Sequence, residues 1–446
     1  MLLLAGVIAL AAALPRQETR AAARERPNVL LIVADDVGTD KLAAYREHPR
    51  TPRTPRLDAL AAQGILFRNA YATPLCSSTR AALLTGRHGR RNGVGALVRG
   101  DGKWELPLEE VTLAELLERG GADYASAAIG KWHLSGPHTA SALRHPNLQG
   151  FEHFAGVIQN LYFDGAPEAS NYFHYHKIVD GVFTQVDEYA TTVTTDDALA
   201  ALARMPEPWF LYVAYNAAHA PLHVPPGSDL PAGAPKSALY DAMVENLDQE
   251  IGRLLDGIPA EPRRRTLVVF LGDNGTDPNA ILPPRDPEQG KATLYEGGIN
   301  VPLLVAGPGV TRPGTVSNAL VHVVDVLPTV AELAGNDPAL TGKALDGRSF
   351  ARVLSEPSSP GPRRFVYSER FEPLGPGPYR VDWRAVRDER YKLIELAGKQ
   401  WFYDLHGRFD DGPARKPSAL KGAERRRLEI LQAELERVRR EVRFEY

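Results

Sequence analysis

Residues 27–38 read PNVLLIVADDVG, and this stretch decides the fold because it places an apolar segment directly before a pair of acidic side chains. The segment 29–34 is continuously apolar rather than alternating, which is typical of a strand covered on both faces. Such strands belong to parallel sheets with helices on both sides. Asp35 and Asp36 follow at the carboxyl end. The stretch therefore predicts an α/β protein whose first strand ends in two carboxylates.

Three further apolar segments end in polar clusters in the same way. These are residues 125–129 before Lys131 and His133, residues 209–215 before His219, and residues 266–271 before Asp273 and Asn274. The carboxyl ends of parallel strands line one edge of an open sheet, where ligands bind. An amphipathic helix over residues 237–256 supplies a crossover between two of these strands. We therefore expect a large mixed, mainly parallel sheet sandwiched by helices, with the polar clusters converging at one edge.

The chain changes character after residue 355. The stretch EPSSPGP, residues 356–362, is typical of a boundary. Four short strand patterns and one charged helix with a leucine stripe follow, at residues 364–368, 383–387, 391–395, 401–405 and 422–440. We predict a small C-terminal antiparallel sheet packed by that helix, so that residues 27–355 form the main domain and residues 356–446 a C-terminal subdomain.

The composition of the chain excludes some classes of function. The chain has 446 residues, 43% of them hydrophobic and 24% charged, which is typical of a globular protein with a sizeable core. A net charge of −3 argues against general affinity for nucleic acid. Cys76 is the one cysteine, so no disulfide forms within the chain.

The N-terminus predicts export. Residues 1–14 read MLLLAGVIALAAAL, an apolar run that is too short to span a bilayer comfortably but long enough for the apolar core of a signal peptide. We interpret residues 1–26 as a signal peptide or leader. The mature protein is then expected to be secreted or periplasmic, without a stable membrane span.

Cys76 lies in the stretch TPLCSSTRAALLTGR, residues 73–87. The hydroxyl residues 77–79 are of the types that cap a helix, here one beginning near Arg80, and Gly86 offers a stop. Cys76 is thus expected near a helix N-terminus, where free N–H groups favour a bound anion. A lone cysteine is more often a small buried apolar residue. The polar clusters elsewhere in the chain favour a site.

Residues 76–80, followed by Leu-Thr-Gly at residues 84–86, resemble the signature of the formylglycine-dependent sulfatases, arylsulfatase type, of the alkaline-phosphatase-like superfamily. That signature is a cysteine or serine, any residue, usually proline, any residue, then arginine. Ser78 stands where the family usually has proline. Further segments resemble the same family, namely the Asp-Asp pair at 35–36, Gly-Lys-Trp-His at 130–133, His-Ala-Pro at 219–221, Asp-Asn-Gly at 273–275 and Gly-Lys at 290–291.

The resemblance implies an active site with a nucleophile, metal ligands and catalytic side chains. A converting enzyme would oxidise Cys76 to formylglycine, whose hydrate attacks the sulfur of a sulfate ester. The implied ligands of Ca²⁺, or Mg²⁺, are Asp35, Asp36, residue 76, Asp273 and Asn274. The implied catalytic residues are Cys76, Arg80, Lys131, His133, His219 and Lys291, of which Lys131, His219 and Lys291 would also bind substrate.

The expected function is therefore hydrolysis of aryl or carbohydrate sulfate esters. The partners implied are the substrate and the formylglycine-generating enzyme, with no nucleic acid. Two alternatives stay open. One is a phosphonate or phosphate ester hydrolase of the same superfamily, and the other is a non-catalytic protein that binds sulfated glycans, which Ser78 alone supports.

Overall fold

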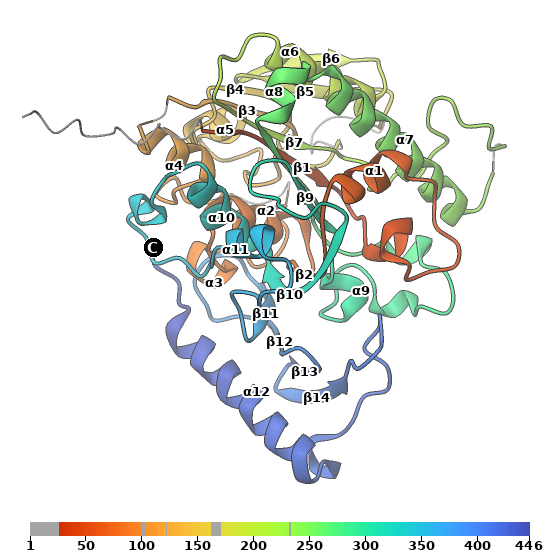
Figure 1. Cartoon of the computed structure of the whole chain (residues 1–446), viewed down its shortest axis with the longest axis vertical. Helices are drawn as coiled ribbons and strands as arrows, with labels where there is room; N and C mark the ends of the chain where they lie inside the picture. Colours follow the sequence, from red (N-terminus) through yellow and green to blue (C-terminus); the bar gives the residue numbers. More distant parts are fainter. Residues whose placement is uncertain (1–25, 100–102, 122, 162–170, 232) are drawn as a thin grey trace, which may run out of the picture.

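A computed structural model describes residues 26–99, 103–121, 123–161, 171–231 and 233–446. Residues 1–25 of the predicted leader therefore lie outside the described residues, as do residues 162–170. The described chain forms a large sheet surrounded by helices and a smaller sheet that carries the C-terminal helix α12 (Figure 1).

The large sheet has the strand order β10-β2-β9-β8-β1-β7-β3-β4-β5-β6. Its strands are β1 (Asn28–Ala34), β2 (Gly64–Tyr71), β3 (Ala125–Lys131), β4 (His153–Val157), β5 (Tyr175–Val179), β6 (Val182–Val186), β7 (Trp209–Ala214), β8 (Thr266–Gly272), β9 (Leu303–Ala306) and β10 (Thr315–His322). Strand β1 pairs in parallel with both β7 and β8, and β3 pairs in parallel with β4 and β7. Strand β9 runs antiparallel to both of its neighbours, and β5 runs antiparallel to β4 and β6. The predicted mixed, mainly parallel sheet is confirmed.

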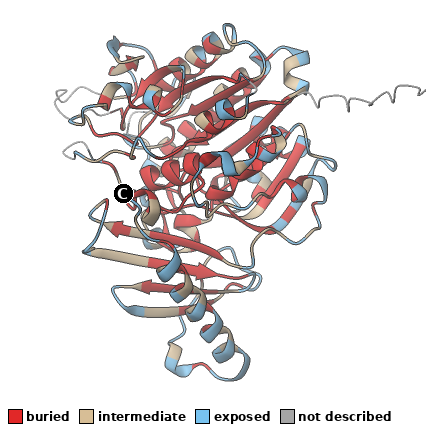
Figure 2. Cartoon of the chain, turned by 90° about the vertical axis from the view of Figure 1, so that its left-hand side faces the viewer, coloured by how far each residue is buried: buried red, intermediate tan, exposed pale blue. Residues whose placement is uncertain are grey.

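Helices cover both faces of this sheet, which explains why β1 is apolar at every position from Val29 to Ala34. Val29, Leu31 and Val33 belong to a core that includes residues of α2 (Cys76–Thr85), α4 (Leu113–Arg119) and α10 (Val326–Leu333). The alternate residues Leu30 and Ile32 belong to a second core with α1 (Pro55–Gln63), α6 (Ala190–Leu202) and α7 (Lys236–Gly257). Buried positions accordingly run through the centre of the molecule (Figure 2).

The smaller sheet is antiparallel, in the order β11-β12-β13-β14. Its strands are β11 (Val366–Glu372), β12 (Val381–Arg387), β13 (Tyr391–Leu396) and β14 (Lys399–Asp404). The leucine stripe of α12 (Gly422–Glu441) packs with Val386, Leu393 and Phe402 of these strands. The predicted C-terminal sheet and helix are confirmed. The remaining α-helices are short: α3 (Gly89–Asn92), α5 (His145–Leu148), α8 (Ala260–Arg264), α9 (Glu296–Ile299) and α11 (Ala351–Ser355).

Helix α6 begins earlier than its sequence pattern indicates. The pattern at residues 195–203 favours a helix opened by Thr195, whereas α6 begins at Ala190. The Thr195 hydroxyl lies 3.4 Å from the Thr191 carbonyl oxygen and 2.9 Å from the Tyr215 hydroxyl, so it is satisfied inside the helix and caps nothing. None of the helices in the described ranges is long and apolar enough to cross a membrane.

Candidate active site

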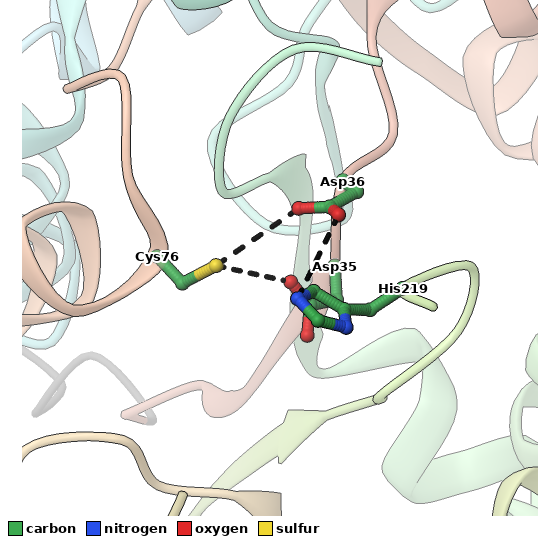
Figure 3. Close-up of side chains that lie close together, drawn as sticks. All are labelled: Asp35, Asp36, Cys76 and His219. Carbon is green, nitrogen blue, oxygen red and sulfur yellow. Dashed lines mark hydrogen bonds and ion pairs between the residues drawn. The ribbon is translucent and has the colours of Figure 1, made fainter. Parts of the chain in front are cut away.

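Four neighbouring strands, β8, β1, β7 and β3, bring the polar clusters to one edge of the large sheet. Asp273 follows β8, Asp35 follows β1, His219 follows β7, and Lys131 ends β3. Cys76 follows the loop after β2 and is the first residue of α2. Asp35, Asp36, Cys76 and His219 face one another across this edge (Figure 3).

The thiol of Cys76 is buried against the Asp pair. Its Sγ lies 3.3 Å from Asp35 Oδ1 and 3.9 Å from Asp36 Oδ1. Burial, together with the negative charges of Asp273 and Asp35, raises the pKa of the thiol well above its usual value. The thiolate is the nucleophilic form of cysteine, so the unmodified side chain is a poor nucleophile here.

The hydroxyls after Cys76 do not cap α2 as expected. The helix begins at Cys76, not near Arg80, and its N-cap Leu75 makes no side-chain capping bond. Ser78 Oγ instead lies 2.6 Å from Thr73 Oγ1 and donates to the Leu75 carbonyl oxygen at 3.0 Å, because the preceding loop folds back over the first turn. Gly86 ends the helix in the left-handed conformation, as predicted.

The acidic side chains are held by a shared network. Asp36 has φ of 63°, and its N–H donates to Asp273 Oδ1 at 3.1 Å. Asn274 Nδ2 donates to Asp36 Oδ1 at 2.9 Å. The carbonyl oxygen of Asp36 accepts from the Tyr240 hydroxyl. Sequence patterns did not single out Tyr240, since it lies among the apolar positions of α7 and looks like a core residue.

Three cationic side chains contact the carboxylates. Arg80 donates Nη2 and Nε to Asp273 Oδ2 at 2.8 and 3.1 Å, and Nη1 to the Lys131 carbonyl oxygen at 2.6 Å. Lys131 Nζ donates to Asp35 Oδ2, and Lys291 Nζ lies 2.6 Å from the Asp36 carboxylate.

These contacts decide the ionisation of the Asp pair. Burial alone would raise the pKa of both carboxyls, yet the positive charges of Lys131 beside Asp35 and of Lys291 beside Asp36 outweigh it and lower both pKa values. Both side chains are therefore carboxylates at neutral pH, the form in which they bind a cation.

The two site histidines differ in their contacts. His219 Nε2 lies 3.9 Å from Asp36 Oδ2, and its Nδ1 lies 2.7 Å from the Ala220 carbonyl oxygen. His133 is buried with φ of 60°, and its Nδ1 has no hydrogen-bond partner among the described residues. Burial, with the charges of Lys131 and Arg80, lowers the pKa of His133 well below its usual value, so its imidazole is neutral at neutral pH.

The donor atoms fit a hard divalent cation. One ligand atom from each of Asp35, Asp36, Cys76 and His219 lies within 4.8 Å of the others. Buried Asn274 adds Oδ1, which has no hydrogen-bond partner in the described part of the chain. Carboxylate and amide oxygens are the ligands that Ca²⁺ and Mg²⁺ prefer. All of the predicted site residues thus come from this one edge of the sheet or from the loops that reach it.

Comparison with known proteins identifies the class. The family described as Sulfatase matches residues 27–336, and the family described as N-sulphoglucosamine sulphohydrolase, C-terminal, matches residues 289–441. The chain belongs to the sulfatase family, and it is a sulfatase.

Individual relatives extend over most of the chain. It is 31% identical to human arylsulfatase G over 84% of its own length and 77% of that protein, and 34% identical to human arylsulfatase A over 82% and 74%. It is 32% identical to human N-acetylgalactosamine-6-sulfatase over 74% and 66%. Its fold matches the crystal structure of Ps i-CgsB in complex with k-i-k-neocarrahexaose, with a TM-score of 0.77, 25% identity and coverage of 93% and 92%.

Proposed function

We propose that this sulfatase hydrolyses carbohydrate sulfate esters with a formylglycine made from Cys76 and a divalent metal ion. The observation that carries the proposal is the position of the Cys76 sulfur, 3.3 and 3.9 Å from the two carboxylates of Asp35 and Asp36. A side chain at this point would lie beside both the cation that these carboxylates would hold and the sulfate to be cleaved. The names of relatives support a sugar substrate, because they include N-acetylgalactosamine-6-sulfatase beside the arylsulfatases.

Asp35, Asp36, Asp273 and Asn274 would hold Ca²⁺ or Mg²⁺. When bound, the ion supplies a Lewis acid that polarises a sulfate oxygen. The hydrated aldehyde of formylglycine supplies one hydroxyl that bonds to sulfur and a second whose deprotonation later expels sulfate and restores the aldehyde.

The chain's own residues move the protons. Asp273 would accept the proton of the attacking hydroxyl, and either Lys291 or His219 would give one to the leaving alcohol oxygen as its bond to sulfur breaks. Lys131 and Arg80 would balance the negative charge of the sulfate and orient it. Neutral His133 then accepts the proton of the second hydroxyl. Overall, water and the sulfate ester give the alcohol, sulfate and one proton.

The maturation partner we propose is a formylglycine-generating enzyme that acts on residues 76–80. We also propose that the chain is exported, because residues 1–14 form a signal-like apolar run. N-terminal sequencing of exported protein should then find a start between residues 14 and 26. An intact Met1 in exported protein would contradict a cleaved leader.

The test of the function is hydrolysis by protein made together with a converting enzyme. Sulfate release from 4-nitrophenyl sulfate and from a monosulfated sugar is expected, with much slower phosphate release from 4-nitrophenyl phosphate. Cys76→Ala should abolish sulfate release. Faster phosphate than sulfate release would favour a phosphoesterase, while binding of sulfated sugar without any hydrolysis by the aldehyde-bearing protein would favour the non-catalytic alternative.

A further inference from the structure

The C-terminal sheet touches the active-site loop that carries Lys291. Arg370 of β11 donates Nη1 to the carbonyl oxygen of Ala292 at 2.9 Å. The N–H of Ala292 donates to the carbonyl oxygen of Pro74 at 2.9 Å, so the same residue also touches the loop before Cys76. Because Lys291 precedes Ala292 in the chain, Arg370 lies one residue away from a side chain of the site.

A second contact brings another arginine to the same place. Ser77, the residue after Cys76, accepts at Oγ from the N–H of Val98 at 3.0 Å. Arg99 follows Val98 and is exposed. The N–H of Phe371 in β11 donates to the carbonyl oxygen of Gly95 at 3.1 Å. The segment from Gly95 to Arg99 therefore begins beside Arg370, the neighbour of Phe371 in the chain. Val98, which precedes Arg99, and Ala292, which accepts from Arg370, therefore each contact a residue close to Cys76 in the chain.

One carboxylate is shared by the basic side chains at this point. Glu372 lies 3.0 Å from Arg370 and 3.2 Å from Arg380, whose side chain is 82% exposed. Burial would raise the pKa of Glu372, but hydrogen bonds from Arg370 and Arg380 and the charge of Arg99 lower it. Glu372 is thus ionised and cannot neutralise three guanidinium groups. Arg99, Arg370 and Arg380 are called the arginine rim below.

The rim has an anchored part and an exposed part. The Arg370 guanidinium lies 4.8 Å from the ring centroid of Trp383 and is tied to both Ala292 and Glu372. Arg380, in contrast, has its ion pair with Glu372 and extends into solvent. An arginine fork of this kind binds sulfate or carboxylate through paired N–H groups.

We propose that the arginine rim binds a second anionic group, a sulfate or a carboxylate, on a sulfated carbohydrate whose scissile sulfate is held at Cys76. This inference rests on the proposed function of the same site and names its substrate class, a saccharide with at least two anionic groups. A monosulfated neutral sugar or an aryl sulfate uses the catalytic site without the rim.

The test compares three substrates: a monosulfated neutral disaccharide, its disulfated form, and a monosulfated disaccharide with a uronate. Converted wild type, Arg380→Gln and Arg99→Gln are assayed, with Arg352→Gln as the matched control. Arg352 is also exposed, at 74%, and also pairs with a glutamate, Glu356 at 3.1 Å, but on α11. The two doubly charged substrates distinguish sulfate from carboxylate as the rim's ligand.

Each rim variant should raise KM for a doubly charged substrate roughly threefold to fivefold, the size of one exposed ion pair, with kcat unchanged. The monosulfated neutral sugar should be unaffected, and about 0.5 M salt should remove most of the difference. Arg352→Gln should match wild type. The proposed role of the rim would be overturned if the variants raised KM equally for charged and neutral substrates, or if they raised it for neither doubly charged substrate.

Calorimetry on the unconverted protein separates this inference from the proposed function. The disulfated sugar should bind wild type more tightly than Arg380→Gln by the same factor. If no sulfate ester is hydrolysed but this difference in affinity persists, the proposed hydrolysis is contradicted and the proposed anion binding by the rim is supported. If esters are hydrolysed and the affinities are equal, the chemistry stands and the rim fails.

Discussion

Ser78 is the residue at which this chain departs from the sulfatase signature. It lies in the first turn of α2, where proline is tolerated because the N–H groups there lack helical partners. Its hydroxyl is occupied by Thr73 and the Leu75 carbonyl oxygen, so serine ties the loop before Cys76 to the helix. Ser78 therefore contributes to local structure at the position that, under the proposed maturation, the converting enzyme would read.

We expect partial conversion of the wild type and a larger converted fraction in Ser78→Pro, since proline restores the family pattern. Mass spectrometry of the tryptic peptide of residues 69–80 measures it, because the aldehyde is lighter than the thiol by the exchange of SH₂ for oxygen. Turnover should rise in proportion. A peptide that is wholly thiol in both proteins, with no turnover in either, would contradict formylglycine chemistry.

Asp35 and Asp273 carry the metal proposal at the residue scale. Asp35→Ala or Asp273→Ala should lower kcat/KM for an aryl sulfate by more than about a hundredfold, because each removes a carboxylate from the ion and from the charge network. Circular dichroism should show that the fold persists, since both residues follow their strands. Asp196→Ala, an exposed acid on α6, is the control. Full activity in either site variant, or in excess chelator, would exclude the metal assignment.

Asp35, Lys131 and Asp273 could be predicted from sequence, because each comes at the end of an apolar segment. Arg80 and Lys291 follow no such segment, so only the resemblance to the family pointed to them. The partners of these residues could not be predicted. Arg80 of α2 donates to Asp273, which follows β8 and is far away along the chain. This contact depends on how β8 and α2 pack. Tyr240 is indistinguishable from a core residue until its hydroxyl is seen on the Asp36 carbonyl oxygen.

At the scale of elements, the continuously apolar strands were predictable and the irregular ones were not. Strands β1, β3, β7 and β8 have buried side chains at every position. Strand β2 carries half-buried Arg68 and Asn69, and β10 is interrupted by a register shift between Ser317 and Leu320. Neither strand therefore shows a clear apolar pattern. Their pairing is also non-local, which spacing along the chain does not reveal.

A buried link between elements positions the end of β3. Trp132, between Lys131 and His133, donates Nε1 to His145 Nδ1 at 3.0 Å, and His145 Nε2 lies 2.8 Å from the Leu106 carbonyl oxygen. His145→Phe leaves both partners unpaired, which should cost about 1 to 3 kcal/mol of stability and lower kcat, with KM less affected. Thermal unfolding and kinetics measure this. Exposed His138→Phe is the control, and an unchanged kcat in His145→Phe would show that the link is only structural.

At the scale of the whole molecule, a buried charge cluster joins the two sheets. Lys392 of β13 lies 2.9 Å from both Glu296 and Asp411, and Arg387 of β12 lies 3.3 Å from Glu296. Tyr71, at the end of β2, donates to Glu296 at 2.7 Å. The cluster therefore ties β2 and α9 of the main domain to the sheet whose first strand, β11, carries Arg370.

Removing the cation from this cluster should loosen the molecule. Lys392→Met leaves two buried acids with one cation fewer, and breaking a buried ion pair in this way should cost about 3 to 5 kcal/mol. Urea unfolding measures the loss. Lys399→Met, at an exposed position of β14, should cost little. Equal stabilities of the two variants would show that the cluster does not hold the sheets together.

Acid should weaken the same junction. Burial would raise the pKa of Glu296, but Lys392 and Arg387 outweigh it and lower the pKa from 4.5 to about 2. The unfolded chain therefore binds the proton more readily than the folded one, so the stabilisation from Glu296 is complete above about pH 4.5 and is lost as the pH falls toward 2. Burial displaces the pKa of Asp411 upward, so the contribution of Glu296 is measured as the difference between wild type and Glu296→Gln. Urea midpoints at pH 6, 4.5 and 3 should show that difference shrinking only below about pH 4.5. A difference that is constant over this range would mean that Glu296 is not ionised in the folded protein.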